Sequence, residues 1–313
     1  MPDQPIRLYL LTGFLGAGKT TLLKRIIDHL HTQKIGILMN EFGSISVDGV
    51  LLQQHGVDIV EINNGSVFCS CLKGAFIDAL VAYSELPIEY LFVETSGMAD
   101  PSNIEPILSN VIGKVKGKAY NYCGSICLVD GANFLEQVDV LAALERQVAS
   151  SSLIVINKLD LVDDETATAV AAKVRQLNPE AELVPARHGD IELDFLDRPL
   201  RAVQTSATAE SCNTPFNRPT AHVITVKGIY DRDAFQAFVE ALVPIALRMK
   251  GFFLLDDGWH QVDAVGPHID IRPTSIPRTT SELVIISDKG FLALTAVYGQ
   301  WDQHFAGREM TLS

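Results

Sequence analysis

Residues 13–20, GFLGAGKT, fit the pattern G-x-x-x-x-G-K-[ST], which is typical of a loop that binds nucleotide phosphates. The glycines let the backbone curve so that successive N–H groups face an anion. Lys19 can neutralise β- and γ-phosphate oxygens, and the Thr20 hydroxyl can bind the Mg²⁺ that bridges them. The predicted nucleotide-binding residues of this loop are Gly13, Gly16, Ala17, Gly18, Lys19, Thr20 and Thr21.

A carboxylate ends another apolar segment in residues 90–97, YLFVETSG. Glu94 could hold the Mg²⁺ shell through water, and the Gly97 N–H could sense a γ-phosphate, as switch loops of nucleotide hydrolases do. The alternative is an ordinary turn at the end of a strand, but the phosphate loop upstream favours the functional interpretation. We therefore predict Lys19, Glu94 and Gly97 as catalytic residues, with Thr20 and Glu94 on the Mg²⁺ side.

Asn157, Lys158 and Asp160 form an N-K-x-D pattern after the apolar segment SSLIVIN. The Asp160 carboxylate can accept the N1 and N2 hydrogens of guanine, and adenine offers no matching pair of donors. This pattern alone is weak, but it follows the phosphate loop and the acid in the order that a GTPase needs. GTP and GDP are therefore the predicted nucleotides. His188, in the following segment ARHGD, is predicted to be a polar residue of a loop near the base.

The three motifs above must be positioned by regular elements of the fold. The chain alternates β-rich and amphipathic segments, which is typical of a parallel sheet with crossover helices. The nearly all-apolar strands indicate a sheet covered on both faces, which is a doubly wound α/β fold of the P-loop NTPase type. Helices are predicted over 19–31, 73–84, 133–148 and 163–177, the last with an Asp as its N-cap. The candidate strands are IRLYLLT, KIGILMN, VDIVEIN, IEYLFVE, CGSICLVD, SSLIVIN and AELVPA.

A second, smaller α+β domain is predicted after a segment rich in proline and polar residues. We expect residues 1–198 to form the nucleotide-binding domain, 199–219 a linker, and 220–313 the C-terminal domain. Within the latter, AHVITVKGI, GFFLLDD, WHQVDAVG and SELVIIS are candidate strands, 231–242 is a candidate helix, and 266–280 is expected to be a proline-rich loop.

Composition excludes several classes of protein. The chain has 313 residues, 47% hydrophobic and 20% charged, so a packed core is expected and intrinsic disorder is not. A net charge of −13 disfavours nucleic acid and anionic membranes as partners. Neither a membrane-spanning segment nor a signal peptide is recognisable. Five cysteines in a chain of this length favour reduced thiols and a cytoplasmic protein.

Four segments in this order resemble the CobW-like GTPases, a group of P-loop GTPases with accessory proteins of urease, hydrogenase and cobalamin enzymes. They are GFLGAGKTTLL, Asn40-Glu41-Phe42-Gly43, Glu94-Thr95-Ser96-Gly97-Met98-Ala99-Asp100-Pro101 and Asn157-Lys158-Leu159-Asp160. In the second domain, Arg248-Met249-Lys250-Gly251 looks like the R-x-K-G element of the family. The resemblance implies a GTPase that couples nucleotide state to metal delivery or to maturation of a metalloenzyme.

The metal-binding part departs from the family pattern. Members usually carry Cys-x-Cys-Cys directly after Asn-Gly, but here Ser66, Val67, Phe68 and Cys69 follow, and Met39 replaces a frequent acid. A zinc site needs at least three nitrogen, sulfur or oxygen ligands, so strong zinc binding is not expected. The pair Cys69 and Cys71 remains, either as two soft ligands or a redox couple, or as small thiols packed near the nucleotide.

Three functions are compatible with these features. The first is a slow, Mg²⁺-dependent GTPase that acts as an accessory factor for a metal- or corrinoid-dependent enzyme. The second is a nucleotide-gated module that docks a client and hardly hydrolyses GTP. The third, a P-loop kinase of a small molecule, is disfavoured by the N-K-x-D pattern. Related proteins suggest that a homodimer could form.

Overall fold

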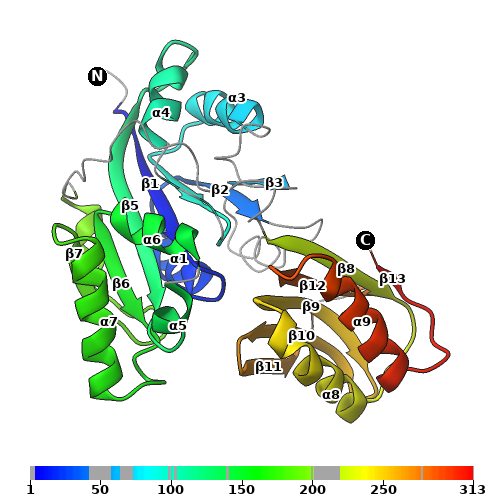
Figure 1. Cartoon of the computed structure of the whole chain (residues 1–313). Coiled ribbons are helices and arrows are strands. Elements are labelled where there is room, and N and C mark those ends of the chain that lie inside the picture. The colour runs from blue at the N-terminus through cyan, green and yellow to red at the C-terminus, as the bar shows by residue number, and fades with distance from the viewer. Residues whose placement is uncertain are drawn as a thin grey trace. The chain divides into compact units, whose positions relative to one another are not determined.

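A computed structural model describes residues 4–41, 58–63, 73–97, 99, 101, 104–138, 141–198, 200, 219–275 and 278–312 (Figure 1). The chain divides into two compact units, of which the first carries the described residues up to 200 and the second those from 219. Most of the predicted linker lies outside the described residues. The boundaries at 198 and 220 therefore stay a prediction.

The first unit is built on a seven-stranded sheet in the order β3-β2-β4-β1-β5-β6-β7, and every strand pair in it is parallel. All seven candidate strands are confirmed, although β5 begins at Tyr120 rather than Cys123. The strands are β1 Ile6–Gly13, β2 Ile35–Glu41, β3 Asp58–Asn63, β4 Tyr90–Glu94, β5 Tyr120–Asp130, β6 Leu153–Asn157 and β7 Glu182–Pro185.

Helices cover both faces of this sheet, as the nearly all-apolar strands require. Helix α1 (Lys19–His29) packs Leu22, Leu23 and Ile26 on one face. Helices α3 (Lys73–Ser84) and α4 (Ile104–Ile112) pack on the opposite face, next to alternate residues of β1, β2 and β4. The remaining helices are α5 Phe134–Val138, α6 Ala142–Ala149 and α7 Asp164–Leu177, with the short 3-10 turn Asp194–Leu196 after β7.

The prediction of one continuous helix over 133–148 was wrong. Two helices occupy this range, α5 and α6, and the residue that precedes α6, Leu141, has an extended backbone. Helix α7 begins as predicted, because the Asp163 side chain accepts a hydrogen bond of 2.8 Å from the Thr166 N–H. Helix α6 also contacts the loop after β4, because its Gln147 side chain donates hydrogen bonds to that loop.

The second unit contains an antiparallel six-stranded sheet in the order β11-β10-β9-β12-β8-β13. Helices α8 (Arg232–Leu242) and α9 (Phe291–His304) pack on one face around buried Phe235, Phe238 and Trp301. The strands are β8 Thr220–Val226, β9 Arg248–Leu255, β10 Gly258–Val265, β11 His268–Pro273, β12 Ser281–Ser287 and β13 Thr311–Leu312, with a 3-10 turn at Val243–Ile245.

Strands β11 and β13 and helix α9 of the second unit were not predicted. Strand β11 lies in the range expected to be a loop, because alternate residues Ile269 and Ile271 pack against the core while Pro273 stands at the strand end. The R-x-K-G element lies inside β9, where Arg248 forms two hydrogen bonds with Asp263 and a Cβ on Gly251 would collide with the backbone of β12.

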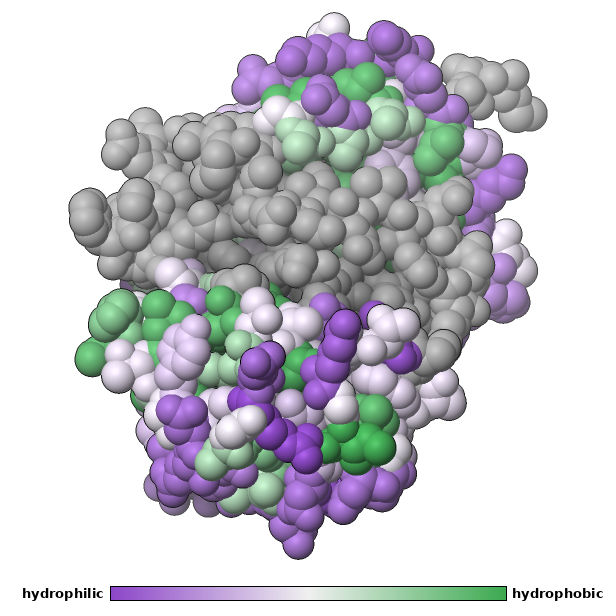
Figure 2. All heavy atoms as spheres, turned by 90° about the vertical axis from the view of Figure 1, so that its right-hand side faces the viewer, coloured by the Kyte–Doolittle hydropathy of each residue, from purple (hydrophilic) through white to green (hydrophobic). Residues whose placement is uncertain are grey.

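Hydrophilic and hydrophobic side chains are interspersed among the coloured residues of Figure 2. The large apolar side chains that are exposed in the second unit are Ile229, Phe291, Leu292 and Tyr298. Among the described residues, no helix has the length and apolar character needed to cross a membrane.

Candidate functional site: a nucleotide-binding centre at the strand ends

The phosphate loop lies between the end of β1 and the start of α1, as predicted. Gly13, Gly16 and Gly18 all have positive φ angles, of 129°, 76° and 107°. A Cβ on Gly13 would collide with the backbone of Leu128, so glycine is required there by both conformation and space. Helix α1 has no side-chain cap at its start, which leaves its first backbone N–H groups for an anion.

Lys19 is held within this loop. Its side chain is buried, and Nζ donates hydrogen bonds to the carbonyl oxygens of Gly13 at 2.8 Å and Phe14 at 3.1 Å. These contacts place the ammonium group beside the loop that would wrap around the phosphates. Ala17 is fully buried and Thr21 is exposed at the start of α1.

Thr20 and Glu94 come together from separate elements. The Thr20 hydroxyl donates to Glu94 Oε1 at 3.5 Å, and Glu94, the last residue of β4, is 4% exposed. A hydroxyl and a carboxylate oxygen are ligands that Mg²⁺ accepts, so this pair fits the predicted Mg²⁺ side of the site. Met39 pairs with Glu94 in the sheet, but its buried side chain belongs to the hydrophobic core.

The loop after β4 packs directly on the phosphate loop. The Thr95 N–H donates to the Leu11 carbonyl oxygen at 2.9 Å, which continues the pairing of β4 with β1. A Cβ on Gly97 would lie 2.6 Å from the backbone nitrogen of Leu15, so only glycine fits at this distance. Gly97 is thus placed next to the phosphate loop, where the sequence predicted a γ-phosphate sensor.

Asn157 joins the base side of the site to the phosphate side. Its Nδ2 donates to the Ala17 carbonyl oxygen at 2.9 Å, and its Oδ1 accepts the Gly189 N–H at 2.9 Å. Gly189 belongs to the segment expected to be a loop near the base. One buried side chain therefore fixes the phosphate loop and this second loop in register.

Asp160 lies in the loop that follows β6, and 24% of its side chain is exposed. His188 Nε2 lies 3.6 Å from Asp160 Oδ2, and the His188 side chain is 77% exposed, as expected for a polar loop residue. Lys158 has a φ of 62° and donates from Nζ to Asp130 Oδ2 at 3.0 Å. The carboxylate of Asp160 is thereby left at the rim, where it can meet a base.

Sequence reasoning missed Asp130 and Gln147. Asp130, the last residue of β5, is buried and accepts hydrogen bonds from the Ala132 N–H and the Asn133 and Lys158 side chains. An acid at the end of an apolar strand was the only signal for it. Gln147, in α6, donates to the loop after β4, and no local pattern distinguishes it.

The candidate transition-metal ligands Cys69 and Cys71 lie outside the described residues. Within the described part of the chain, no group of three or more His, Cys, Asp or Glu side chains is arranged to hold a metal ion. Cys127 and Cys123 are both free thiols of β5. Burial raises the pKa of the Cys127 thiol to about 12, although the Lys19 charge and the Ser151 hydroxyl act in the opposite direction.

The chain is similar to several known proteins, both by sequence and by fold. Over 198 residues the chain is 35% identical to the zinc chaperone YjiA of Escherichia coli, covering 61% of each protein. It is 27% identical to the zinc chaperone CobW of Sinorhizobium sp, covering 75% of this chain and 73% of that protein. The crystal structure of Zn(II)-bound YjiA GTPase from E. coli is 24% identical with a TM-score of 0.46, covering 95% of this chain and 99% of that one.

The zinc-regulated GTPase metalloprotein activator 1 of Dictyostelium discoideum is 27% identical over 58% of this chain, which spans 46% of that protein. Two family models also match. Residues 7–185 match the CobW/HypB/UreG nucleotide-binding domain, and residues 220–303 match the cobalamin synthesis protein cobW C-terminal domain. Because the first of these matches covers more than half of the chain, the protein belongs to the CobW family of P-loop proteins.

Proposed function

We propose that the protein binds GTP together with Mg²⁺ and hydrolyses it to GDP and phosphate. The observation that carries this proposal is the bridge made by Asn157, which ties the phosphate loop at Ala17 to the base-side loop at Gly189. A site for a guanine nucleotide needs both loops at a fixed separation, since the base and the phosphates belong to one ligand and must be bound at the same time.

Each residue has a role that follows from its position. Lys19 and the first N–H groups of α1 neutralise the phosphates, and Asp160 accepts the N1 and N2 hydrogens of guanine. Thr20 directly, and Glu94 through water, would hold Mg²⁺, which would supply positive charge at the phosphate oxygens. In the reaction, a water oxygen bonds to the γ-phosphorus while the bond from that phosphorus to the β–γ bridging oxygen breaks, which yields GDP and phosphate.

We further propose that the GTPase serves a metal- or corrinoid-dependent enzyme. The names of the relatives support a metal-related client, because two of them are zinc chaperones and a third is an activator of metalloproteins. The metal would be cargo, with Cys69 and Cys71 as candidate soft ligands. Hydrolysis is expected to be slow without the client, and a homodimer is the oligomer to test for.

Binding of a non-hydrolysable GTP analogue, measured by calorimetry with Mg²⁺, tests the nucleotide part of the proposal. Lys19→Ala should abolish binding, because the phosphates lose their main counter-charge. Lys114→Ala, which removes an exposed lysine after α4, is the control and should bind as the wild type does. Unchanged affinity in Lys19→Ala would refute the assignment of the phosphate loop.

Turnover distinguishes an accessory GTPase from a nucleotide-gated module. Phosphate release is measured for the protein alone and with each candidate metalloenzyme in its apo form. An accessory GTPase should be accelerated by its client, whereas a gated module should bind the client only in one nucleotide state and show no acceleration.

A further inference from the structure

Gln147 is a buried amide that contacts the loop after β4. It lies in α6 and is 1% exposed, and its Nε2 donates to the Gly97 carbonyl oxygen at 3.1 Å and to the Ala99 carbonyl oxygen at 2.9 Å. Both acceptors belong to the segment that carries the predicted γ-phosphate sensor. One side chain therefore holds two backbone positions of that loop.

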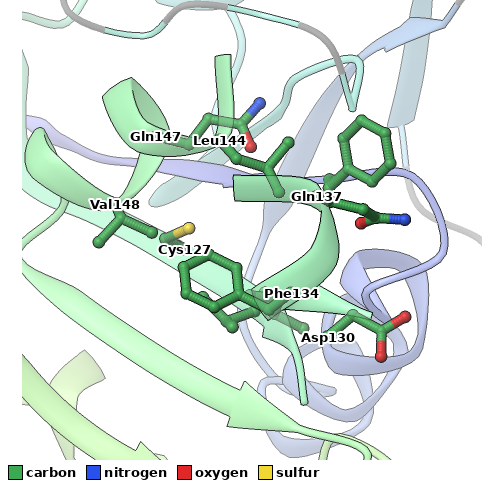
Figure 3. A pocket seen from close by; sticks show the side chains of 10 residues that line it. Cys127, Asp130, Phe134, Gln137, Leu144, Gln147 and Val148 are labelled. Carbon is green, nitrogen blue, oxygen red and sulfur yellow. The ribbon is translucent and has the colours of Figure 1, made fainter. Parts of the chain in front are cut away.

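The amide oxygen of Gln147 shows that the contact is not simply a way to fill space. Within the described part of the chain, Gln147 Oε1 is buried without a hydrogen-bond partner. An unsatisfied buried carbonyl group destabilises the folded state, a cost that a leucine at this position would avoid. The position is compatible with an apolar residue, because its neighbours in the small cavity between α5, α6 and β5 include Phe134, Leu144 and Val148 (Figure 3).

Helix α6 provides a fixed base for this donor. The Ser151 hydroxyl donates to the Gln147 carbonyl oxygen at 2.7 Å and lies 3.0 Å from the Ser125 hydroxyl of β5. The Asn178 amide donates to the carbonyl oxygens of Val148 and Ser151 at 2.8 and 2.9 Å. The end of α6 is thus bound to β5 and to the end of α7, so Gln147 projects from a rigid part of the fold.

The loop after β4 is held on two sides. Thr95 pairs with Leu11 of β1 on one side, and Gln147 holds Gly97 and Ala99 on the other. Gln147 holds the Gly97 carbonyl, which belongs to the peptide plane after Gly97, and a Cβ on Gly97 would lie 2.6 Å from the backbone nitrogen of Leu15. Because Thr95 is anchored on β1 before it and the carbonyl is anchored after it, the Gly97 N–H lies between two fixed points and its rotation is restricted. A donor that is already oriented costs little further ordering when the phosphate arrives.

We propose that Gln147 is a positioning residue of the GTPase site, which orients the Gly97 N–H for the γ-phosphate through the hydrogen bonds to Gly97 and Ala99. This inference rests on the proposed GTPase function. Through Gln147, helix α6 would then help the protein to distinguish GTP from GDP, because only GTP carries the γ-phosphate that Gly97 would contact.

The test compares two nucleotides in one variant. Gln147→Leu removes both donors, and the affinities for GDP and for a non-hydrolysable GTP analogue are measured by calorimetry with Mg²⁺, together with kcat and KM for GTP. The GTP analogue should bind about tenfold more weakly and kcat should fall, since two hydrogen bonds are lost. GDP should bind within about twofold of the wild type, because it makes no contact with Gly97.

Gln137→Leu is the matched control. Gln137 lines the same cavity from α5, so the variant makes the same chemical change next to the same core without removing a contact to the loop. It should retain the wild-type ratio of GTP to GDP affinity. If Gln147→Leu does not fold, Gln147→Met, which has a similar length and carries neither a charge nor a donor, is compared by the same ratio of GTP to GDP affinity.

The outcomes separate the inference from the function it rests on. A wild type that binds neither nucleotide overturns the proposed function and the inference with it. A wild type that binds both, with a Gln147 variant whose GTP and GDP affinities are unchanged or fall equally, overturns only the positioning role. A selective loss of GTP affinity that Gln137→Leu does not share supports it.

Discussion

Asn157 Nδ2 donates a 2.9 Å hydrogen bond to the carbonyl oxygen of Ala17, a residue 140 positions earlier in the chain. The first residue of the N-K-x-D pattern therefore contacts the phosphate loop directly. It supports the backbone of the phosphate loop, and through Oδ1 it also holds the Gly189 N–H. The base and phosphate halves of the site are joined inside the protein before a nucleotide binds.

Asn157→Ala should lower the affinities for GTP and for GDP by similar factors, because both nucleotides bind to the same phosphate loop. It leaves a buried carbonyl and a buried N–H without partners, so we expect the free energy of unfolding to fall by about 1–3 kcal/mol. Calorimetry with both nucleotides and urea unfolding without nucleotide measure these effects. A loss of affinity for GTP alone would contradict this role and would indicate that Asn157 acts on the γ-phosphate.

Asp160→Asn should shift the base preference from guanine to xanthine. The amide can donate to O2 of xanthine, where the carboxylate would repel it, and the change should be about tenfold or more because a bidentate base contact is worth about 1–3 kcal/mol. Competition between GTP, XTP and ATP measures it. Asp164→Asn, an exposed acid in the first turn of α7, is the control and should keep the preference for guanine. A wild type that binds ATP as well as GTP would refute the guanine assignment.

Zinc should bind more weakly to this protein than to typical relatives. The positions that the family pattern would use are Ser66, Phe68 and Met39, and none is a good zinc donor. The double variant Cys69→Ser, Cys71→Ser should leave GTP binding nearly intact and affect only client activation. Titration of Zn²⁺ against a chromogenic chelator tests this prediction. A tight, stoichiometric site that disappears in the double variant would show that the ligand set is larger than these residues.

Cys127 should make the stability of the first unit fall at alkaline pH. Burial raises the pKa of this thiol from 9.0 to about 12, so the folded state keeps a proton that the unfolded state releases. Its contribution is fully present below about pH 9 and is lost as the pH rises toward 12. Urea unfolding between pH 8 and 11 should therefore show a shallower decline for Cys127→Ser than for the wild type. If the free energy of unfolding declines with pH equally in both proteins, a group other than Cys127 is responsible for the decline.

Local patterns were sufficient to predict the strands of the first unit and the places of the candidate site residues at the element ends. The glycines of residues 13–18 are needed by backbone geometry that no other residue adopts at low cost. Lys19 is the first residue of α1, and Glu94 is the last residue of the apolar strand β4. These constraints act within a few residues, so the sequence shows them. The same reasoning failed for 133–148 and 268–273, where helix breaks and an edge strand depend on what the segments pack against.

The sequence by itself determined the phosphate loop and the doubly wound fold that carries it, and it predicts an acid for the Mg²⁺ side and a base-recognition motif. Only the tertiary structure decided how they are held together, by Asn157 at Ala17, Lys158 at Asp130 and Gln147 at Gly97. Two of these three partners are backbone carbonyl groups, which every residue has and no residue type identifies. The contacts form because parallel strands bring distant chain ends to one edge of the sheet, and that proximity is a property of the fold.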